Sequence, residues 1–297
     1  MPAISTNFPD VLDARIGKVF NDRWRQLPDM IGRFFSMVGA GDSSQKQDYR
    51  TSEVGTFGDV PVHTGTVVYD DIFEGYDGII TPLEYSTGFQ IERKLFDDDL
   101  TGIIEGKPKA LATALQRTRQ RHAAQLFVNS FAVDGTWNNY TEAVALCSNS
   151  HTTRSGASTT AGFDNLVTTA LSWASLSAAR IQMRGFRGDR AERIQVMADT
   201  LVVPPDLEPQ AYELVQSAGY PEDARNAANF LQSKFSVVVW DYLTDTNDWW
   251  LIDSTMMKDA VTWFERTGVE FGMVEDFDTF TGKWRLYNRY GHGHNGW

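Results

Sequence analysis

The stretch KPKALATALQRTRQRHAAQLFVNSFAVDG, residues 107–135, carries the strongest helical pattern of this 297-residue chain. Pro108 suits the first turn of a helix, and Gly135 suits its end. An apolar stripe recurs at spacings of three or four, through Leu111, Leu115, Thr118, His122 and Leu126. The pattern predicts one helix over residues 107–132, roughly 37 Å long at about 1.5 Å per residue.

The other side of this helix is basic, whereas the segment before it is acidic. The predicted exposed side carries Lys107, Lys109, Arg117, Arg119 and Arg121. Residues 51–91 contain no lysine or arginine but seven carboxylates, namely Glu53, Asp59, Asp70, Asp71, Glu74, Asp77 and Glu84. Such one-sided charge is typical of a solvated hairpin or of a surface that meets an oppositely charged partner.

Strands and loops are predicted on both sides of the helix. Residues 59–85, DVPVHTGTVVYDDIFEGYDGIITPLEY, mix β-branched and aromatic residues with glycine, which predicts a long β-hairpin with a mobile tip. Residues 146–165 are rich in Ser, Thr, Gly and Asn and are expected to form a loop. Asp164 or Asn165 is expected to cap a helix over residues 166–185.

The C-terminal half predicts shorter elements and then a long meander. We expect a strand over residues 193–205, a helix over 206–219, and a β-hairpin with strands within 235–243 and 247–255. Residues 261–297 alternate between apolar and polar, through Val269, Phe271, Met273, Trp284, Leu286 and Tyr290. Together with an N-terminal arm containing one or two short helices, these elements predict an α+β fold.

Composition excludes several classes of protein. The formal net charge of −12 argues against binding nucleic acid through phosphate contacts, which need an excess of lysine and arginine. No apolar run is long enough to span a membrane, and no secretion signal opens the sequence. The single cysteine excludes an intramolecular disulfide.

Cys147 and His151, in LCSNSHTTRSG, are the most tempting chemical pair. A nucleophile with its base and half of a zinc site are both weak interpretations, because neither a third catalytic residue nor further ligands are apparent. His292 and His294 could share one face of a strand, yet a terminal Gly/His segment is more typical of the surface. Asp97, Asp98 and Asp99 lack calcium-loop spacing. We therefore expect no catalytic residue, no metal and no cofactor.

The order of elements is more informative than any single motif. An arm, an acidic hairpin, FQIERKLFDDDLTG, one long helix, the LCSNSHTTRSG loop, LVVPPDLEPQAYEL, DTNDWWLID and FDTFTGKWRLYNRYGHG follow one another. This order resembles the major capsid proteins of tailed bacteriophages, specifically the Mu-type major head subunit family with the Hong Kong 97-type shell fold. The resemblance extends from about residue 8 to the end.

The resemblance implies a division of the chain. Residues 1–50 would be the N-terminal arm, 51–92 the extended loop that reaches over a neighbouring subunit, and 93–162 peripheral domain with the spine helix. Residues 163–255 would be the axial domain around the five-fold and six-fold axes, and 256–297 a peripheral β-meander. In this family the Cys147–His151 stretch is a structural loop, so Cys147 is expected to be a buried small residue and His151 a hydrogen-bonding one.

The resemblance also implies partners and a location. The chain would assemble with itself into pentamers and hexamers of an icosahedral shell that encloses double-stranded DNA without reading its sequence. It would be made in the host bacterial cytoplasm and end in the virion, with a separate scaffolding protein, a portal and decoration proteins as candidate partners. Some relatives cross-link through a lysine of the extended loop, but residues 51–91 contain none, so no such link is expected.

We expect the acidic loop to lie over a neighbour's basic helix face, with apolar residues supplying most of the affinity. The predicted inter-subunit contacts are Val67, Val68, Asp70, Asp71, Ile72, Phe73, Glu74, Ile79, Ile80, Lys107, Lys109, Arg117, Arg119 and Arg121. Three alternatives remain open: an encapsulin-like compartment shell, a phage tail or decoration protein, and a soluble enzyme that uses Cys147 and His151.

Overall fold

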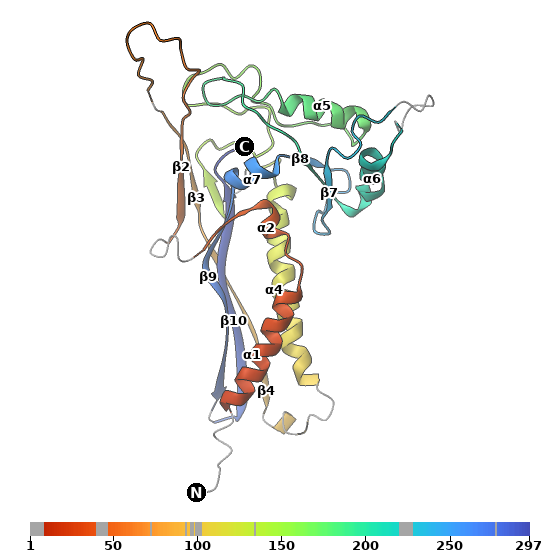
Figure 1. The fold of residues 1–297 in the computed structure, drawn as a ribbon. Helices are drawn as coiled ribbons and strands as arrows, with labels where there is room; N and C mark the ends of the chain where they lie inside the picture. The colour runs from red at the N-terminus through yellow and green to blue at the C-terminus, as the bar shows by residue number, and fades with distance from the viewer. Residues whose placement is uncertain are drawn as a thin grey trace.

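A long helix and a four-stranded sheet lie side by side along the length of the molecule (Figure 1). The computed structural model describes residues 9–39, 47–71, 73–92, 94–95, 98, 103–133, 135–219, 228–276 and 278–297. The helix is α4 (Ile103–Val128), and the sheet has the order β1 (Ser36–Val38), β9 (Val261–Asp276), β10 (Thr281–His294), β4 (Leu83–Glu92). The predicted α+β class is confirmed.

The spine helix α4 is as long as predicted, but both of its ends lie four residues closer to the N-terminus than in the predicted range of 107–132. Pro108 therefore lies inside the helix, where its missing N–H costs one intrahelical hydrogen bond. The helix stops at Val128 because the chain turns there, and the Ser130 carbonyl accepts a hydrogen bond from the Cys147 N–H at 2.7 Å. Phe131, which lies beyond the end of the helix, is 44% exposed as a result.

The N-terminal segment packs along the spine instead of standing free. Helix α1 (Pro9–Gln26) lies against α4 and β9, and the short α2 (Ile31–Phe34) leads into β1, which pairs in parallel with β9. Phe20 of α1 is buried with Ala112 and Leu115 of α4 and with Leu286 of β10. This apolar face explains why two helices with many charged residues stay together.

The predicted acidic hairpin exists, but only its second strand lies inside the expected range of residues 59–85, and its first strand comes earlier. Strand β2 (Tyr49–Val54) pairs with β3 (Glu74–Ile80), which also pairs with β5 (Asn138–Tyr140), and residues 55–73 between β2 and β3 contain no strand among those described. Residues 83–92, counted with the hairpin loop in the sequence, form β4 on the spine sheet. Segments form strands here where a neighbouring strand is available for pairing. β propensity alone cannot identify these segments.

A second α/β unit branches from the upper end of the spine in Figure 1. It contains α5 (Trp173–Met183), α6 (Glu208–Gln216), the single turn η2 (Pro205–Leu207), and a sheet with the order β7 (Ser236–Val239), β6 (Thr200–Val203), β8 (Trp250–Ile252). Leu176, Leu201, Leu214 and Leu231 are among its buried core residues.

Two local predictions in this unit were wrong. Strands β7 and β8 do not form a hairpin: both pair with β6, whose four residues are all buried and need partners on each side. Helix α5 begins at Trp173, because Ser172 and Ser175 form a capping box. Neither expected cap lies at its start: Asn165 accepts from the Ser148 N–H at 2.7 Å, and the Asp164 carbonyl accepts from Gln182 Nε2 at 2.8 Å.

The C-terminal meander is confirmed as the long β9–β10 hairpin, preceded by the short helix α7 (Ser254–Ala260). Trp284, Leu286 and Tyr290 are buried as expected. His292 and His294 are not surface residues, since they are only 1% and 8% exposed. The Gly/His segment is the end of β10, covered by β3 and β5. No helix in the described ranges is both long and apolar enough to cross a membrane.

Candidate functional site

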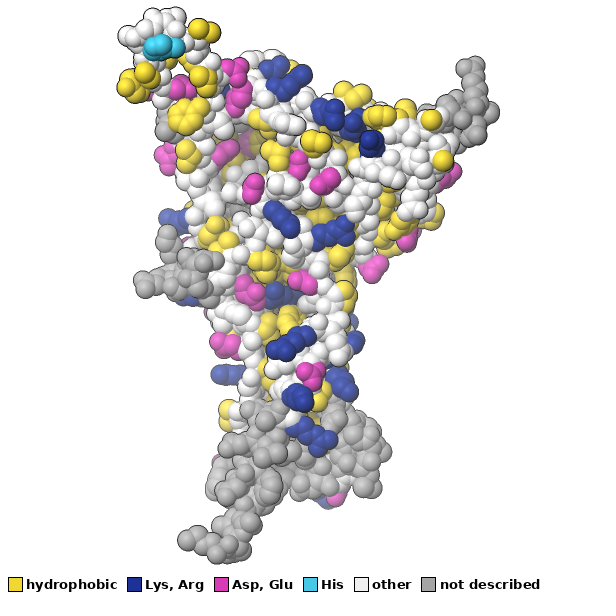
Figure 2. Space-filling view, viewed as in Figure 1, with side chains coloured by type: hydrophobic (Ala, Val, Ile, Leu, Met, Phe, Trp, Pro, Cys, Tyr) yellow, Lys and Arg dark blue, Asp and Glu magenta, His cyan; other side chains and the backbone are white. Residues whose placement is uncertain are grey.

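The connection between β2 and β3, residues 55–73, projects from the upper end of the molecule (Figure 1). Every residue from 59 to 71 is exposed. Figure 2 shows hydrophobic side chains on this loop. Six of them are 65–94% exposed, namely Phe57, Val60, Val62, Val67, Val68 and Tyr69. A loop this apolar and this exposed is typical of a surface that binds a partner.

The predicted apolar contacts separate into two groups. Val67 and Val68 are each 66% exposed and Phe73 is 41% exposed, so these side chains are accessible. Ile79 is half-buried, and Ile80 is only 2% exposed because it packs against the glycines of β10. Ile80 thus belongs to the core of its own subunit, which corrects its assignment to an interface. Ile72 lies outside the described residues.

The base of the loop is held by a turn that the sequence prediction missed, residues 187–193, which we call the clip. Arg187 and Arg193 form an isolated antiparallel bridge. Between them, Arg190 donates to the Asp70 carboxylate and to the Asp71 carbonyl, and its guanidinium lies 5.3 Å from the centre of the Phe73 ring. The only sequence signal for the clip is an arginine at every third position from 184 to 193.

Further contacts draw the loop base against the clip. Thr56 Oγ1 donates to the Glu192 carboxylate at 2.6 Å, and the Gly55 N–H donates to the Phe73 carbonyl at 2.7 Å. A Cβ at Gly55 would lie 2.7 Å from an Asp189 carboxylate oxygen and 2.9 Å from the Phe73 carbonyl oxygen. Only glycine allows the two segments to approach this closely.

The acidic residues of the loop are partly used within their own subunit. The Gly58 N–H, at 3.0 Å, and then Arg190 hold the pKa of Asp70 below its usual value. Glu74 accepts from Ser52 Oγ at 3.2 Å, whereas the Asp59 and Asp71 side chains are exposed. Asp70 therefore meets a basic partner in the clip of its own chain, and its contact with a neighbour's helix stays a prediction.

The basic residues of α4 do not all share one face. Lys107, Lys109, Arg117 and Arg121 are exposed, as predicted. Arg119 is only 5% exposed, so it is not part of the basic surface. Its guanidinium makes a two-point contact with Glu265 of β9, at 2.6 and 3.3 Å, and donates to Asn288 Oδ1 at 3.0 Å.

The surroundings of Arg119 explain how a charge is tolerated inside. The Trp24, Trp263 and Tyr290 rings lie with their centres 5.3–5.6 Å from its guanidinium carbon. Asn288 is fully buried at an irregularity of the β9–β10 register, and its amide donates to Glu265 at 3.0 Å and to the Thr267 carbonyl at 2.8 Å. A β-bulge thus turns Asn288 inward to complete the ion pair.

Buried histidines line the junction of α4 with the sheets. His122 Nδ1 lies 2.8 Å from the Tyr290 hydroxyl, the His292 ring packs 4.6 Å from Trp137, and the His294 ring packs 5.0 Å from Tyr140. Burial lowers the pKa of His122 to about 4, that of His292 to about 3 and that of His294 to about 4. These histidines are therefore neutral at pH 7, which keeps the junction free of unpaired charge.

The Cys147–His151 pair is structural in its geometry. His151 is buried, with Nδ1 3.1 Å from the Glu142 carboxylate and Nε2 3.3 Å from the Leu146 carbonyl, and it stacks 4.4 Å from Trp297. Its prediction as a hydrogen-bonding loop residue is confirmed. Cys147 is half-buried against the main core, and burial raises the pKa of its thiol to about 11. A catalytic thiol needs the opposite shift.

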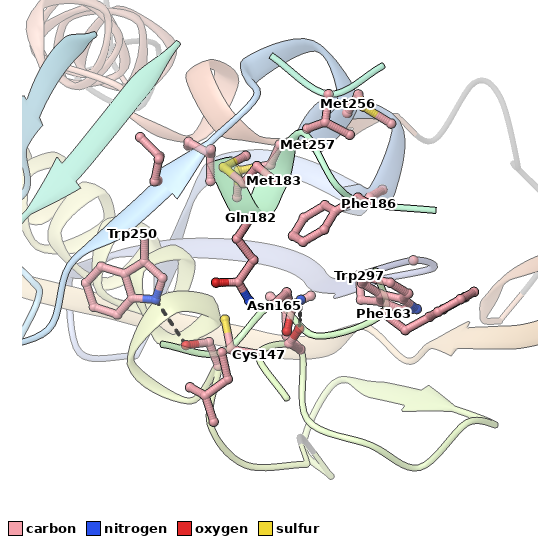
Figure 3. A pocket seen from close by; sticks show the side chains of 18 of the residues that line it. Cys147, Phe163, Asn165, Gln182, Met183, Phe186, Trp250, Met256, Met257 and Trp297 are labelled. Carbon is pink, nitrogen blue, oxygen red and sulfur yellow. Dashed lines mark hydrogen bonds between the residues drawn. The ribbon is translucent and has the colours of Figure 1, made fainter. Parts of the chain in front are cut away.

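A cavity of about 650 Å³ lies beside Cys147, between the 146–170 loop, α5, β8, α7 and the C-terminal Trp297 (Figure 3). Sequence patterns gave no sign of it, because its walls come from segments that lie far apart in the chain. In the part of the chain that the structure describes, no three His, Cys, Asp or Glu side chains gather as metal ligands.

Comparison with known proteins gives one family and a consistent fold. The model of a family described as phage capsid protein matches residues 77–295. The structure of the bacteriophage JBD30 capsid is similar with a TM-score of 0.55 at 13% identity, over 76% of this chain and 94% of that chain. The PhiM1 mature capsid gives 0.55 at 11% identity, over 91% and 84%.

The capsid of the native GTA particle, computed with C5 symmetry, gives a TM-score of 0.50 at 11% identity, over 91% of this chain and 88% of that chain. None of the curated proteins matches the sequence. At these identities the solved structures show only that the fold is similar. The family assignment rests on the match of the sequence to the family model.

Proposed function

This chain belongs to the phage capsid protein family, and we propose that it is the major shell subunit of a tailed bacteriophage, assembling through pentamers and hexamers into an icosahedral head. Its role in the virion is structural. The pentamer proposal gains support from the C5 symmetry of the GTA capsid, a particle with a similar subunit fold.

The projecting loop of residues 55–73 carries the proposal. Six large apolar side chains on it face solvent in the isolated subunit, an arrangement that becomes favourable when a second subunit covers them. We propose that this loop lies over a neighbouring subunit, with Val67, Val68 and Phe73 in the contact. The clip holds the base of the loop, so its direction is set within one subunit before assembly.

A second support is the extended shape of the subunit. The spine, the branched α/β unit and the projecting loop extend in different directions (Figure 1), so a shell would offer each of them a neighbouring subunit to pack against.

Charged residues would set how the two subunits align at this contact. The exposed Lys107, Lys109, Arg117 and Arg121 of α4 would face exposed loop carboxylates of a neighbour such as Asp59 and Asp71. Each exposed pair contributes about 0 to 1 kcal/mol, so the charges align the subunits and the apolar residues supply the affinity.

We further propose the division predicted from the sequence, with residues 163–255 as the axial domain and 93–162 with 256–297 as the peripheral domain. The branched α/β unit and the spine fit these roles in shape (Figure 1). A separate scaffolding protein, a portal and decoration proteins are proposed partners, and synthesis is proposed in the host cytoplasm. With a net charge of −12, the shell would enclose DNA without binding it tightly.

Electron microscopy and sedimentation test the proposal on the full chain, expressed alone and with a candidate scaffolding protein. Closed shells, or rings of five and six subunits, are expected. The variant Val67→Asp/Val68→Asp should give at least about tenfold fewer shells, because burying two unpaired carboxylates costs several kcal/mol.

Val274 is a matched control, since it is also 66% exposed but lies on β9. Val274→Asp should assemble normally. Normal shells from the double variant would contradict the loop contact, and a persistent small oligomer in both preparations would contradict a shell function.

A further inference from the structure

The cavity beside Cys147 is large enough for a ligand. Its volume of about 650 Å³ lies within the roughly 300–1,000 Å³ of typical small-molecule sites. Figure 3 shows side chains from the 146–165 loop, α5, β8, α7 and the C-terminus around one space. It separates the branched α/β unit from the end of the spine, so a bound molecule would contact both.

The walls favour an apolar, polarisable occupant. Met183, Met256 and Met257 lie on one side, and Phe186, Trp250 and Trp297 contribute aromatic surface. Methionine side chains adapt their shape and make favourable sulfur–aromatic contacts. An aromatic ring would therefore find both sulfur and ring partners in this cavity.

Gln182 is a polar group of the wall that is placed to orient a ligand. Gln182 extends into the cavity from α5, and its Nε2 donates to the Asp164 carbonyl at 2.8 Å. This bond fixes the amide, and none of the hydrogen bonds among the described residues uses Gln182 Oε1. The neighbouring Asn165 amide is used by the loop, through Ser148 N at 2.7 Å and the Leu146 carbonyl at 2.8 Å. The cavity thus presents Gln182 Oε1 as a fixed, neutral acceptor among its apolar side chains.

Charge at the cavity argues against an anion. The lining contains four carboxylates and two guanidiniums, those of Glu53, Asp189, Asp248, Asp253, Arg154 and Arg187. Burial, and then the nearby Asp245, raise the pKa of Asp248. A negatively charged ligand would be repelled by these carboxylates and would also lose its hydration on entering the cavity.

We propose that this cavity binds a small, neutral aromatic molecule carrying one hydrogen-bond donor, with the ring between the methionines and the aromatic side chains and the donor on Gln182 Oε1. The proposal concerns the unassembled subunit and does not depend on shell formation. Three probes separate its parts: 2-naphthol has ring and donor, naphthalene has only the ring, and naphthalene-2-sulfonate carries a negative charge.

Binding is measured on the purified full chain at about pH 7 by quenching of tryptophan fluorescence, since Trp250 and Trp297 line the cavity. A second readout is the rate at which N-ethylmaleimide alkylates Cys147, the only cysteine of the chain. We expect 2-naphthol to bind saturably and to slow alkylation, naphthalene to bind more weakly, and the sulfonate not to bind.

The variant Gln182→Leu should weaken 2-naphthol about threefold to tenfold, the usual worth of one hydrogen bond, and leave naphthalene unchanged. Gln195→Leu makes the same chemical change at an exposed position outside the cavity and should change neither. The proposal is overturned if 2-naphthol leaves the alkylation rate of the wild-type chain unchanged, or if the sulfonate binds as tightly as 2-naphthol. Equal losses for 2-naphthol and naphthalene in Gln182→Leu would overturn the role of Gln182.

Discussion

Arg119 lies on the buried side of the spine helix, although its charge suggests the side that faces solvent. Its guanidinium is enclosed by three aromatic rings and bonded to Glu265 and Asn288. A buried ion pair adds little net stability compared with a well-packed apolar pair, but breaking it leaves a charge without its partner. Arg119 therefore fixes how α4, β9 and β10 meet.

Replacing Arg119 with Leu should lower the free energy of unfolding by about 3 kcal/mol, because Glu265 loses its counter-charge in a largely buried position. Urea unfolding of the purified subunit measures this loss. Arg117→Leu, an exposed change on the same helix, should stay within about 0.5 kcal/mol. A loss as small as the control's would show that Glu265 finds water or another partner.

The buried histidines make the subunit sensitive to acid. The folded pKa values of His122, His292 and His294 are lowered to about 4, 3 and 4 by burial, while the unfolded chain titrates near 6.5. Their contribution is fully present above about pH 6.5 and is lost as pH falls toward 4, since the unfolded state binds the protons. The slope is about 1.4 kcal/mol per pH unit for each histidine.

Urea unfolding between pH 7 and pH 4 tests this, with His292→Phe as the informative variant. It should reduce the slope in this window, because Phe at this position binds no proton. His63→Phe, a change in the exposed loop, should leave the slope as in the wild type. An unchanged slope in His292→Phe would place the acid sensitivity elsewhere.

At the scale of elements, the clip and the projecting loop form one unit although about 120 residues separate them. Arg190 reaches Asp70, Asp71 and Phe73, and Thr56 bonds to Glu192. The loop has few other contacts, since residues 59–71 are all exposed. The contacts at the base of the loop therefore set the direction in which the loop projects.

Arg190→Ala should loosen this base and speed amide hydrogen exchange severalfold at Gly55 and Gly58, whose N–H groups are bonded there. Arg184→Ala removes an exposed arginine from the neighbouring segment and should leave the exchange unchanged. Hydrogen exchange followed by mass spectrometry measures both. Equal exchange in wild type and Arg190→Ala would mean that β2–β3 pairing alone sets the loop.

At the scale of the whole molecule, the subunit combines a narrow spine with a branched unit and a projecting loop (Figure 1). This extended shape agrees with membership of the phage capsid protein family. The apolar side chains of the projecting loop and the basic side chains of α4 are exposed on separate elements.

The sequence by itself determined the features that depend on neighbours along the chain. The 3.6-residue pattern predicted the spine helix, and alternation predicted the β9–β10 hairpin. Local periodicity and turn chemistry suffice for this helix and this hairpin, because the residues that cooperate in them lie within a few positions of one another. The capsid fold was implied by the resemblance of the element order to that of phage capsid proteins.

Only the tertiary structure decided which charges are buried and which strands pair. Arg119 and Arg117 look alike in sequence. Arg119 is buried and Arg117 is exposed, because Glu265 and Asn288 face only Arg119. Strands β7 and β8 look like a hairpin, yet the fully buried β6 separates them. The clip and the cavity join segments far apart in the chain, and such contacts are set by packing and desolvation across the fold, which no local pattern records.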